Sequence, residues 1–172
     1  TFTVRRYEHL ANSSRGHAVP IIDGHAQKPG RDRSAEMWVC RDDGERTVFG
    51  LRLEQAYGLP GLSGLSREWD WHYAERTLYI RDNFTFSTAN HRIVETLLFH
   101  DEPRIVQPGT IEVDAGVCKL EIAYPPAAEA RVIRETFTTR RGEKASVSIV
   151  SLDLHCPERN ADVVIAIRIR LP

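Results

Sequence analysis

The sequence predicts an all-β protein, an antiparallel β-sandwich of about ten or more strands with little helix. The first observation behind this prediction is the alternation of apolar and polar residues, which places every second side chain on the same face of a strand. It is clearest in segment 163–171, where Arg168 and Arg170 oppose an apolar face made by Val163, Ile165, Ile167, Ile169 and Leu171. The second observation is turn chemistry between such segments, at Asp23-Gly24, Pro29-Gly30, Asp43-Gly44, Pro108-Gly109 and Arg141-Gly142.

The candidate strands share this alternation or are short apolar runs bounded by turns. In chain order they are segments 1–7, 17–22, 35–40, 47–53, 76–84, 92–99, 111–115, 118–124, 145–154 and 163–171. Segment 128–137 fits a helix or a strand about equally well, and we favour a strand. In segment 145–154 the apolar register shifts by one residue after Ile149, which predicts a β-bulge. Segment 58–73 holds three glycines and a proline and is predicted to be an exposed loop.

The bulk composition indicates one soluble-type globular domain spanning residues 1–172. The formal net charge is −1 and the basic residues are scattered, so we expect no nucleic-acid partner. The chain contains no run of about 18 apolar residues, so we expect no membrane partner. It opens on Thr1 rather than Met, and we expect it to be a piece of a longer protein.

The cysteines and histidines form no generic catalytic motif. The three cysteines, Cys40, Cys118 and Cys156, are odd in number and widely spaced, which favours free thiols packed as small apolar side chains. His155 and Cys156 are neighbours on a strand and point to opposite faces, so we do not expect them to act together. His17 and His25 lie near opposite ends of a candidate strand and would not share a metal ion. Judged alone, His17 is either a ligand or a histidine satisfied by loop carbonyls.

Aromatic residues suggest a second candidate site. Trp69, Trp71 and Tyr73 alternate onto one face inside a polar stretch and could stack against sugar rings. The alternative is that they are core or loop anchors, which is the more common role of aromatics in a sandwich. We therefore take these three residues as candidate substrate-binding residues.

Four motifs in a fixed order resemble the C-terminal β-domain of the heparinase II/III-like polysaccharide lyases. The first is NSSRGHAVPIIDGHAQ, in which the family pattern is carried by Ser14, His17, Ala18, Val19, Ile21, Ile22, Asp23, Gly24 and Gln27. The second is LEQAYG, with Leu53, Ala56 and Tyr57, and the third is ERTLYIRDNFTF, with Arg76, Thr77, Leu78 and Asp82. The fourth is HRIVETLLFH, residues 91–100. The resemblance runs from about Tyr7 to Leu154, and the first thirty residues are its most diagnostic part.

The resemblance implies a β-sandwich that packs behind an N-terminal α/α-toroid of the same protein. Such lyases cut an acidic, uronic-acid-containing polysaccharide by β-elimination, and their catalytic residues lie mainly on the toroid. The resemblance therefore implies no catalytic residue in this chain, since those residues are expected upstream of Thr1. Several members of the family hold a zinc ion, and His17 corresponds to one of its ligands. The other ligands would precede Thr1, so we expect zinc only in the full-length parent and none in this segment alone.

Three hypotheses follow for function. The chain is the C-terminal sandwich of a heparinase II/III-like lyase and is inactive in isolation, or it is a non-catalytic carbohydrate-binding sandwich that uses Trp69, Trp71 and Tyr73. In the third, the parent works in surface-polysaccharide metabolism without lyase activity. The resemblance favours a bacterial protein of the periplasm or cell envelope.

Overall fold

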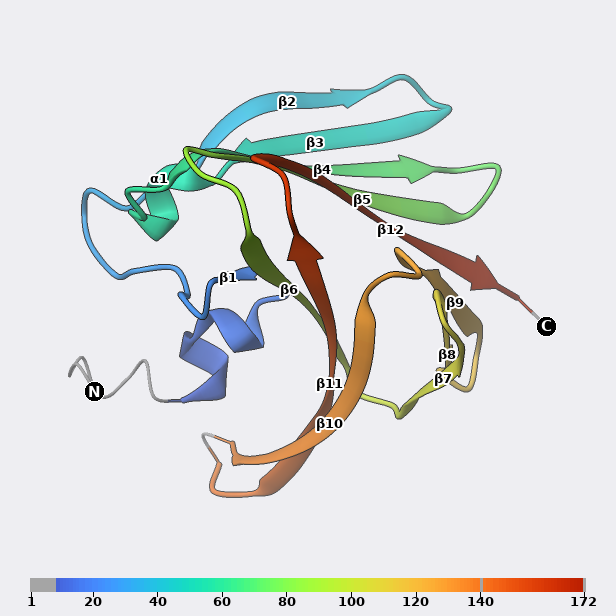
Figure 1. The fold of residues 1–172 in the computed structure, drawn as a ribbon. Helices are drawn as coiled ribbons and strands as arrows, with labels where there is room; N and C mark the ends of the chain where they lie inside the picture. Colours follow the sequence, from blue (N-terminus) through green and yellow to red (C-terminus); the bar gives the residue numbers. More distant parts are fainter. Residues whose placement is uncertain (1–8, 140, 172) are drawn as a thin grey trace.

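The structure, a computed structural model, describes residues 9–139 and 141–171 and consists of two antiparallel sheets. The smaller sheet has the strand order β1-β6-β11-β10, and the larger has the order β2-β3-β4-β5-β12-β9-β8-β7. In Figure 1, β2–β5 and β12 form the upper layer, β6, β10 and β11 run below it, and β7–β9 curl round at the right. The predicted all-β sandwich is confirmed.

The described residues form twelve strands and a few short helical turns. The strands are β1 (Ile21–Ile22), β2 (Glu36–Asp42), β3 (Arg46–Arg52), β4 (Leu62–His72), β5 (Thr77–Phe86), β6 (His91–Phe99), β7 (Pro103–Gln107), β8 (Thr110–Asp114), β9 (Lys119–Ala123), β10 (Glu129–Thr138), β11 (Lys144–Cys156) and β12 (Asn160–Arg170). The helical turns are the 3-10 helices η2 (Leu10–Asn12) and η3 (Ser14–Gly16) and the α-helix α1 (Glu54–Tyr57). None of the helices described is long and apolar enough to cross a membrane.

The core lies between the facing surfaces of the two sheets. In β12 the buried residues Val163 and Ile165 lie on the apolar face that the sequence predicted, while Arg168 is exposed on the other face. The largest side chains sealed in the core include Tyr57, Phe84, Ile22, Leu65, Ile93 and Leu152. Segment 128–137 is a strand, β10, as favoured, and segment 1–7 lies outside the described residues.

The predicted loop over residues 58–73 is wrong, because most of that stretch is strand β4. Its glycines lie at the start, where the pairing with β5 is irregular between Leu62 and Gly64. From Leu65 onward the strand alternates, but its inward row contains Arg67, and its outward row contains the buried Asp70. A buried charge on each face concealed the apolar period on which the prediction depended.

The predicted bulge in β11 is also wrong. The strand pairs with β6 and β10 without a register shift, from Ser148 to Cys156 and from Lys144 to Asp153 respectively. The two apolar sets therefore point to opposite faces. The second set faces the core, and the first is covered on the outer side, where Val147 lines one small cavity together with Leu10, Ala11 and Gly16. A strand covered on both faces does not need a bulge to hide its apolar residues.

Two smaller expectations are corrected. Segment 17–22 is a strand only at Ile21–Ile22, because the residues before it follow η3 in an irregular course. The three cysteines are free, but only Cys156 is buried as predicted. Cys118 is half-buried and Cys40 is exposed.

Candidate functional site

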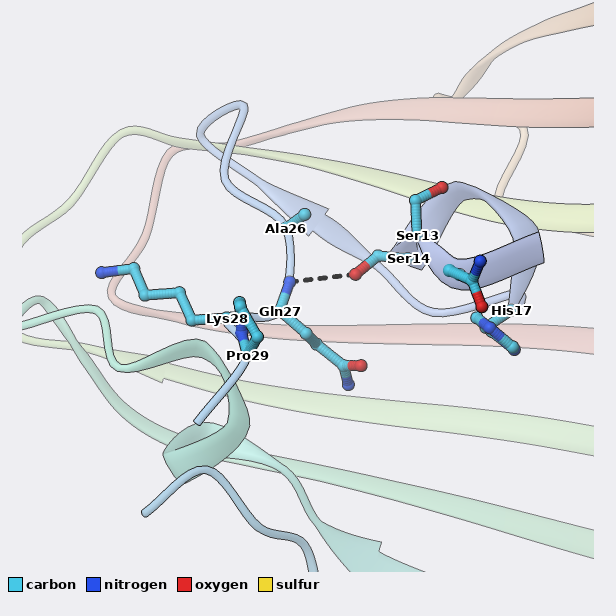
Figure 2. Close-up of a pocket in the computed structure, with 8 residues that line it drawn as sticks. Ser13, Ser14, His17, Ala26, Gln27, Lys28 and Pro29 are labelled. Atoms are coloured by element: carbon cyan, nitrogen blue, oxygen red, sulfur yellow. Dashed lines mark hydrogen bonds between the residues drawn. The ribbon is translucent and has the colours of Figure 1, made fainter. Parts of the chain in front are cut away.

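The segment from Asn12 to His17 forms one wall of a cavity of about 250 Å³. The opposite wall is the chain from Ala26 to Pro29, which follows the turn after β1 (Figure 2). The two walls are joined by the backbone N–H of Gln27, which donates to Ser14 Oγ at 3.0 Å. The turn itself has φ of +50° at Asp23 and +77° at Gly24, as a type I′ turn requires.

His17 is exposed, and its ring is oriented by the backbone before it. Its Nε2 lies 3.1 Å from the carbonyl oxygen of Ala11, and its backbone N–H donates to Ser14 O at 3.1 Å. Because a carbonyl only accepts hydrogen bonds, Nε2 carries the proton in this contact. In the neutral ring the lone pair is then on Nδ1. A histidine that binds a metal commonly has this arrangement, with one nitrogen free for the metal and the other donating to a carbonyl.

The described residues do not complete a zinc site by themselves. Within 9–139 and 141–171 no three His, Cys, Asp or Glu side chains lie close enough to hold a metal ion. The other polar residues of the cavity are amides, hydroxyls and a lysine, which are poor zinc ligands. His17 can supply one ligand, and any further ligands would have to come from outside the described residues.

We expect the substitution Gly16→Ala to disturb this wall selectively. A Cβ built on Gly16 would lie 2.1 Å from the carbonyl oxygen of Leu10, so the backbone of η2 must move. The contact between His17 and the Ala11 carbonyl should be lost, at a stability cost of about 1–3 kcal/mol. Proton NMR of the His17 ring, together with urea unfolding, checks this. Gly64→Ala is the matched control, because its Cβ would meet only ordinary contacts at 3.4 Å.

A buried ionic cluster lies next to Ala18, the residue that follows His17, and the sequence did not predict it. Arg67 on β4 donates through Nε and Nη2 to Asp82 on β5, at 2.7 and 2.6 Å. The same Nη2 donates to Glu95 on β6 at 2.7 Å, so the cluster bridges the two sheets. All three side chains are at most 3% exposed. One signal in the sequence could have indicated the cluster. Arg67 and Asp82 each stand among the apolar residues that face inward on β4 and β5, and they are direct partners across the two strands.

The charges in the cluster do not balance if both carboxylates are ionised. Burial raises the pKa of Glu95 well above its ordinary value, and the nearby charge of Asp82 raises it further. Burial alone would lower the pKa of Arg67, yet its acidic neighbours, Asp82 foremost, hold it above its ordinary range. One guanidinium therefore faces one carboxylate, Asp82, and one protonated acid, Glu95.

A second contact joins the turn after β1 to β6. Asp23 accepts from the backbone N–H of Arg92 at 2.8 Å, and its Oδ2 lies 2.7 Å from His91 Nδ1. Burial would raise the pKa of Asp23, but these two contacts outweigh it and hold the pKa below its ordinary value. Asp23 and His91 belong to the first and fourth sequence motifs, which the fold thus brings together.

The aromatic candidates continue the inward row of β4 away from Arg67. Trp69 and Trp71 lie on the same face of the strand, and Tyr73 follows its end. Trp69 is half-buried against the core, 5.5 Å from Phe49 between ring centroids, and the Arg67 guanidinium carbon lies 5.8 Å from its ring. Trp71 and Tyr73 meet edge to face at 6.4 Å. Tyr73 is 44% exposed and donates to Asp42 at 2.9 Å. The row runs from buried to exposed, and only its far end offers free aromatic surface.

Comparison with known proteins identifies the fold. No protein-family model matches the sequence, and no curated protein matches it significantly. Among solved structures, heparan sulfate lyase HepC from Pedobacter heparinus superposes with a TM-score of 0.73 and 10% identity. The match covers 100% of this chain and 27% of that chain. The heparinase III BT4657 gene product gives a TM-score of 0.68 at 9% identity, over 92% of this chain and 24% of that chain.

The chain has the fold of one region of these lyases. The resemblance predicted from the four motifs is thereby confirmed for the fold. The chain spans about a quarter of the length of each lyase that it matches.

Proposed function

We propose that this chain is the C-terminal sandwich domain of a lyase that cleaves a uronic-acid-containing polysaccharide by β-elimination, and that it is inactive in isolation. The observation that carries the proposal is the superposition of the whole chain on about a quarter of a heparan sulfate lyase. The four motifs support it as well, and two contacts bring the second and the fourth of them against the first in space.

In this proposal the chain contributes to the cleft but carries neither the catalytic base nor the catalytic acid. In β-elimination a base removes the proton at C5 of the uronate, and an acid protonates the leaving oxygen. We assign both groups to parts of the protein upstream of Thr1. His17 is then the residue that this domain presents to the cleft, and in the full-length parent it supplies one zinc ligand through Nδ1. Trp71 and Tyr73 offer surface for sugar rings beyond it.

The test compares the full-length parent with the isolated chain on heparin, heparan sulfate and alginate. Elimination creates a carbon–carbon double bond conjugated to the carboxylate, so ultraviolet absorbance should rise with the parent on at least one uronate and not with the chain alone. No rise with the parent on any of the three would contradict the proposal.

The zinc assignment is checked by metal analysis of parent variants: His17→Ala should lower zinc content and His25→Ala should not.

A carbohydrate-binding module without catalysis is the second candidate. The half-exposed Trp71 and the exposed Tyr73 favour it. In that case the isolated chain should bind heparin or alginate, and Trp71→Ala should weaken binding by about 1–3 kcal/mol, whereas Trp38→Ala on β2 should not. Equal binding by wild type and Trp71→Ala would contradict it. A parent that binds the polysaccharide without cleaving it would favour the third possibility, a role in surface-polysaccharide metabolism.

A further inference from the structure

Three consecutive backbone carbonyls follow His17, and each accepts a hydrogen bond from a buried side chain of a different element. Arg67 Nη1 on β4 donates to Ala18 O. Thr96 Oγ1 on β6 donates to Val19 O at 3.1 Å. Tyr57 Oη, at the end of α1, donates to Pro20 O at 2.6 Å. The donors are 0–4% exposed, so none of them is available for other partners in solvent.

The backbone held in this way is strained. Ala18 has φ of +50°, a left-handed conformation that costs an L-residue with a Cβ about 1–2 kcal/mol. Such a conformation persists only where the surroundings determine it from several sides. Here the donors come from both sheets and from α1, and the residue before Ala18 is His17.

The side chain of His17 is also fixed from the opposite direction. Its ring contacts the Ala11 carbonyl, and Ser14 accepts from the Gln27 backbone across the cavity. His17 therefore lies between two segments held by hydrogen bonds. The turn before it is bonded to the opposite wall of the cavity, and the segment after it is bonded to buried side chains of the core. Apolar side chains at these three positions could not donate to the three successive carbonyls, which would then lose their hydrogen bonds.

We infer that Arg67, Thr96 and Tyr57 are positioning residues for His17. They hold the strained segment Ala18 to Pro20 and so keep the imidazole at the mouth of the cavity. This rests on the proposed function in one respect, that His17 is the residue this domain presents to the cleft. Asp82 and Glu95 bind the Arg67 guanidinium and fix its position. The ionic cluster therefore also helps to position His17.

The test removes one donor at a time with little change in volume. Thr96→Val and Tyr57→Phe each delete one hydroxyl, and Ser148→Ala is the matched control. Ser148 is likewise a buried hydroxyl, but it accepts from Arg134 on the other half of the small sheet. In the isolated chain, NMR should show a cross-relaxation signal between the His17 ring and Ala11 in wild type and in Ser148→Ala. That signal should be lost or strongly reduced in Thr96→Val and in Tyr57→Phe.

A His17 ring signal that is unchanged in both hydroxyl variants would overturn the inference. Near-ultraviolet circular dichroism of the core aromatic residues shows whether each variant is still folded. A variant that keeps this spectrum but loses the His17 signal has lost the positioning of His17 and not its fold. In the full-length parent, the same two variants should weaken zinc binding by about tenfold, the low end for residues that orient a ligand. A parent that binds no zinc would contradict the proposed role of His17 and leave the NMR result on positioning standing.

Discussion

Replacing Arg67 with methionine is expected to lower the free energy of unfolding by about 3–5 kcal/mol, the cost of breaking a buried ion pair from one side. The side chain is 3% exposed, and its loss leaves the Asp82 carboxylate in the core without a counter-charge. It also frees the Ala18 carbonyl from its donor. Urea unfolding of the isolated chain, followed by circular dichroism, measures the difference.

The control is Arg104→Met, because that arginine also meets a carboxylate at 2.6 Å, that of Glu112, but is 71% exposed. An exposed pair contributes about 0–1 kcal/mol, so this variant should unfold almost as wild type does. Arg67→Lys should fall between the two, since an ammonium keeps the charge but cannot bind Asp82 through two nitrogens. Equal costs for Arg67→Met and Arg104→Met would contradict the prediction, since the buried pair would then contribute no more than an exposed one.

The strands that the sequence predicted well are those with one apolar face and one polar face. In β12, Val163 and Ile165 face the core while Asp162, Arg168 and Arg170 are exposed on the other face, so the sequence pattern follows burial there. The prediction failed where this simple rule does not hold. β11 is covered on both faces at Ile149 and Val150, and β4 buries Arg67 on one face and Asp70 on the other.

The candidate site was predictable as a stretch of sequence but not as an arrangement. The motifs singled out His17, Asp23, Tyr57 and Asp82 without giving a reason for their order. The structure supplies part of the reason, because Tyr57 donates to Pro20 while Asp23 pairs with His91. Such contacts depend on which strands become neighbours in space, and a pattern along the chain carries no information about that.

The second large effect is expected from the proton that Glu95 keeps in the folded chain, through the pH dependence of stability. Glu95 has a raised pKa in the folded chain and its ordinary value of 4.5 when unfolded, so the folded state retains a proton that the unfolded state loses. The stability that this proton contributes is full below the ordinary pKa and declines as the pH rises towards the raised one. Wild type should therefore lose about 1.4 kcal/mol per pH unit in that window relative to Glu95→Gln.

Glutamine mimics the protonated acid, so Glu95→Gln should match wild type near the ordinary pKa of glutamate and become the more stable protein as the pH rises. Asp82→Asn should act through the same residue, since with Asp82 neutral Glu95 ionises against Arg67 and its pKa falls. Glu129→Gln, at an exposed carboxylate beside Arg131, is the control and should follow wild type at every pH. Urea unfolding at several pH values gives the curves. Parallel curves for wild type and Glu95→Gln would mean that Glu95 is ionised in the folded chain, and that Arg67 carries two charged partners in the core.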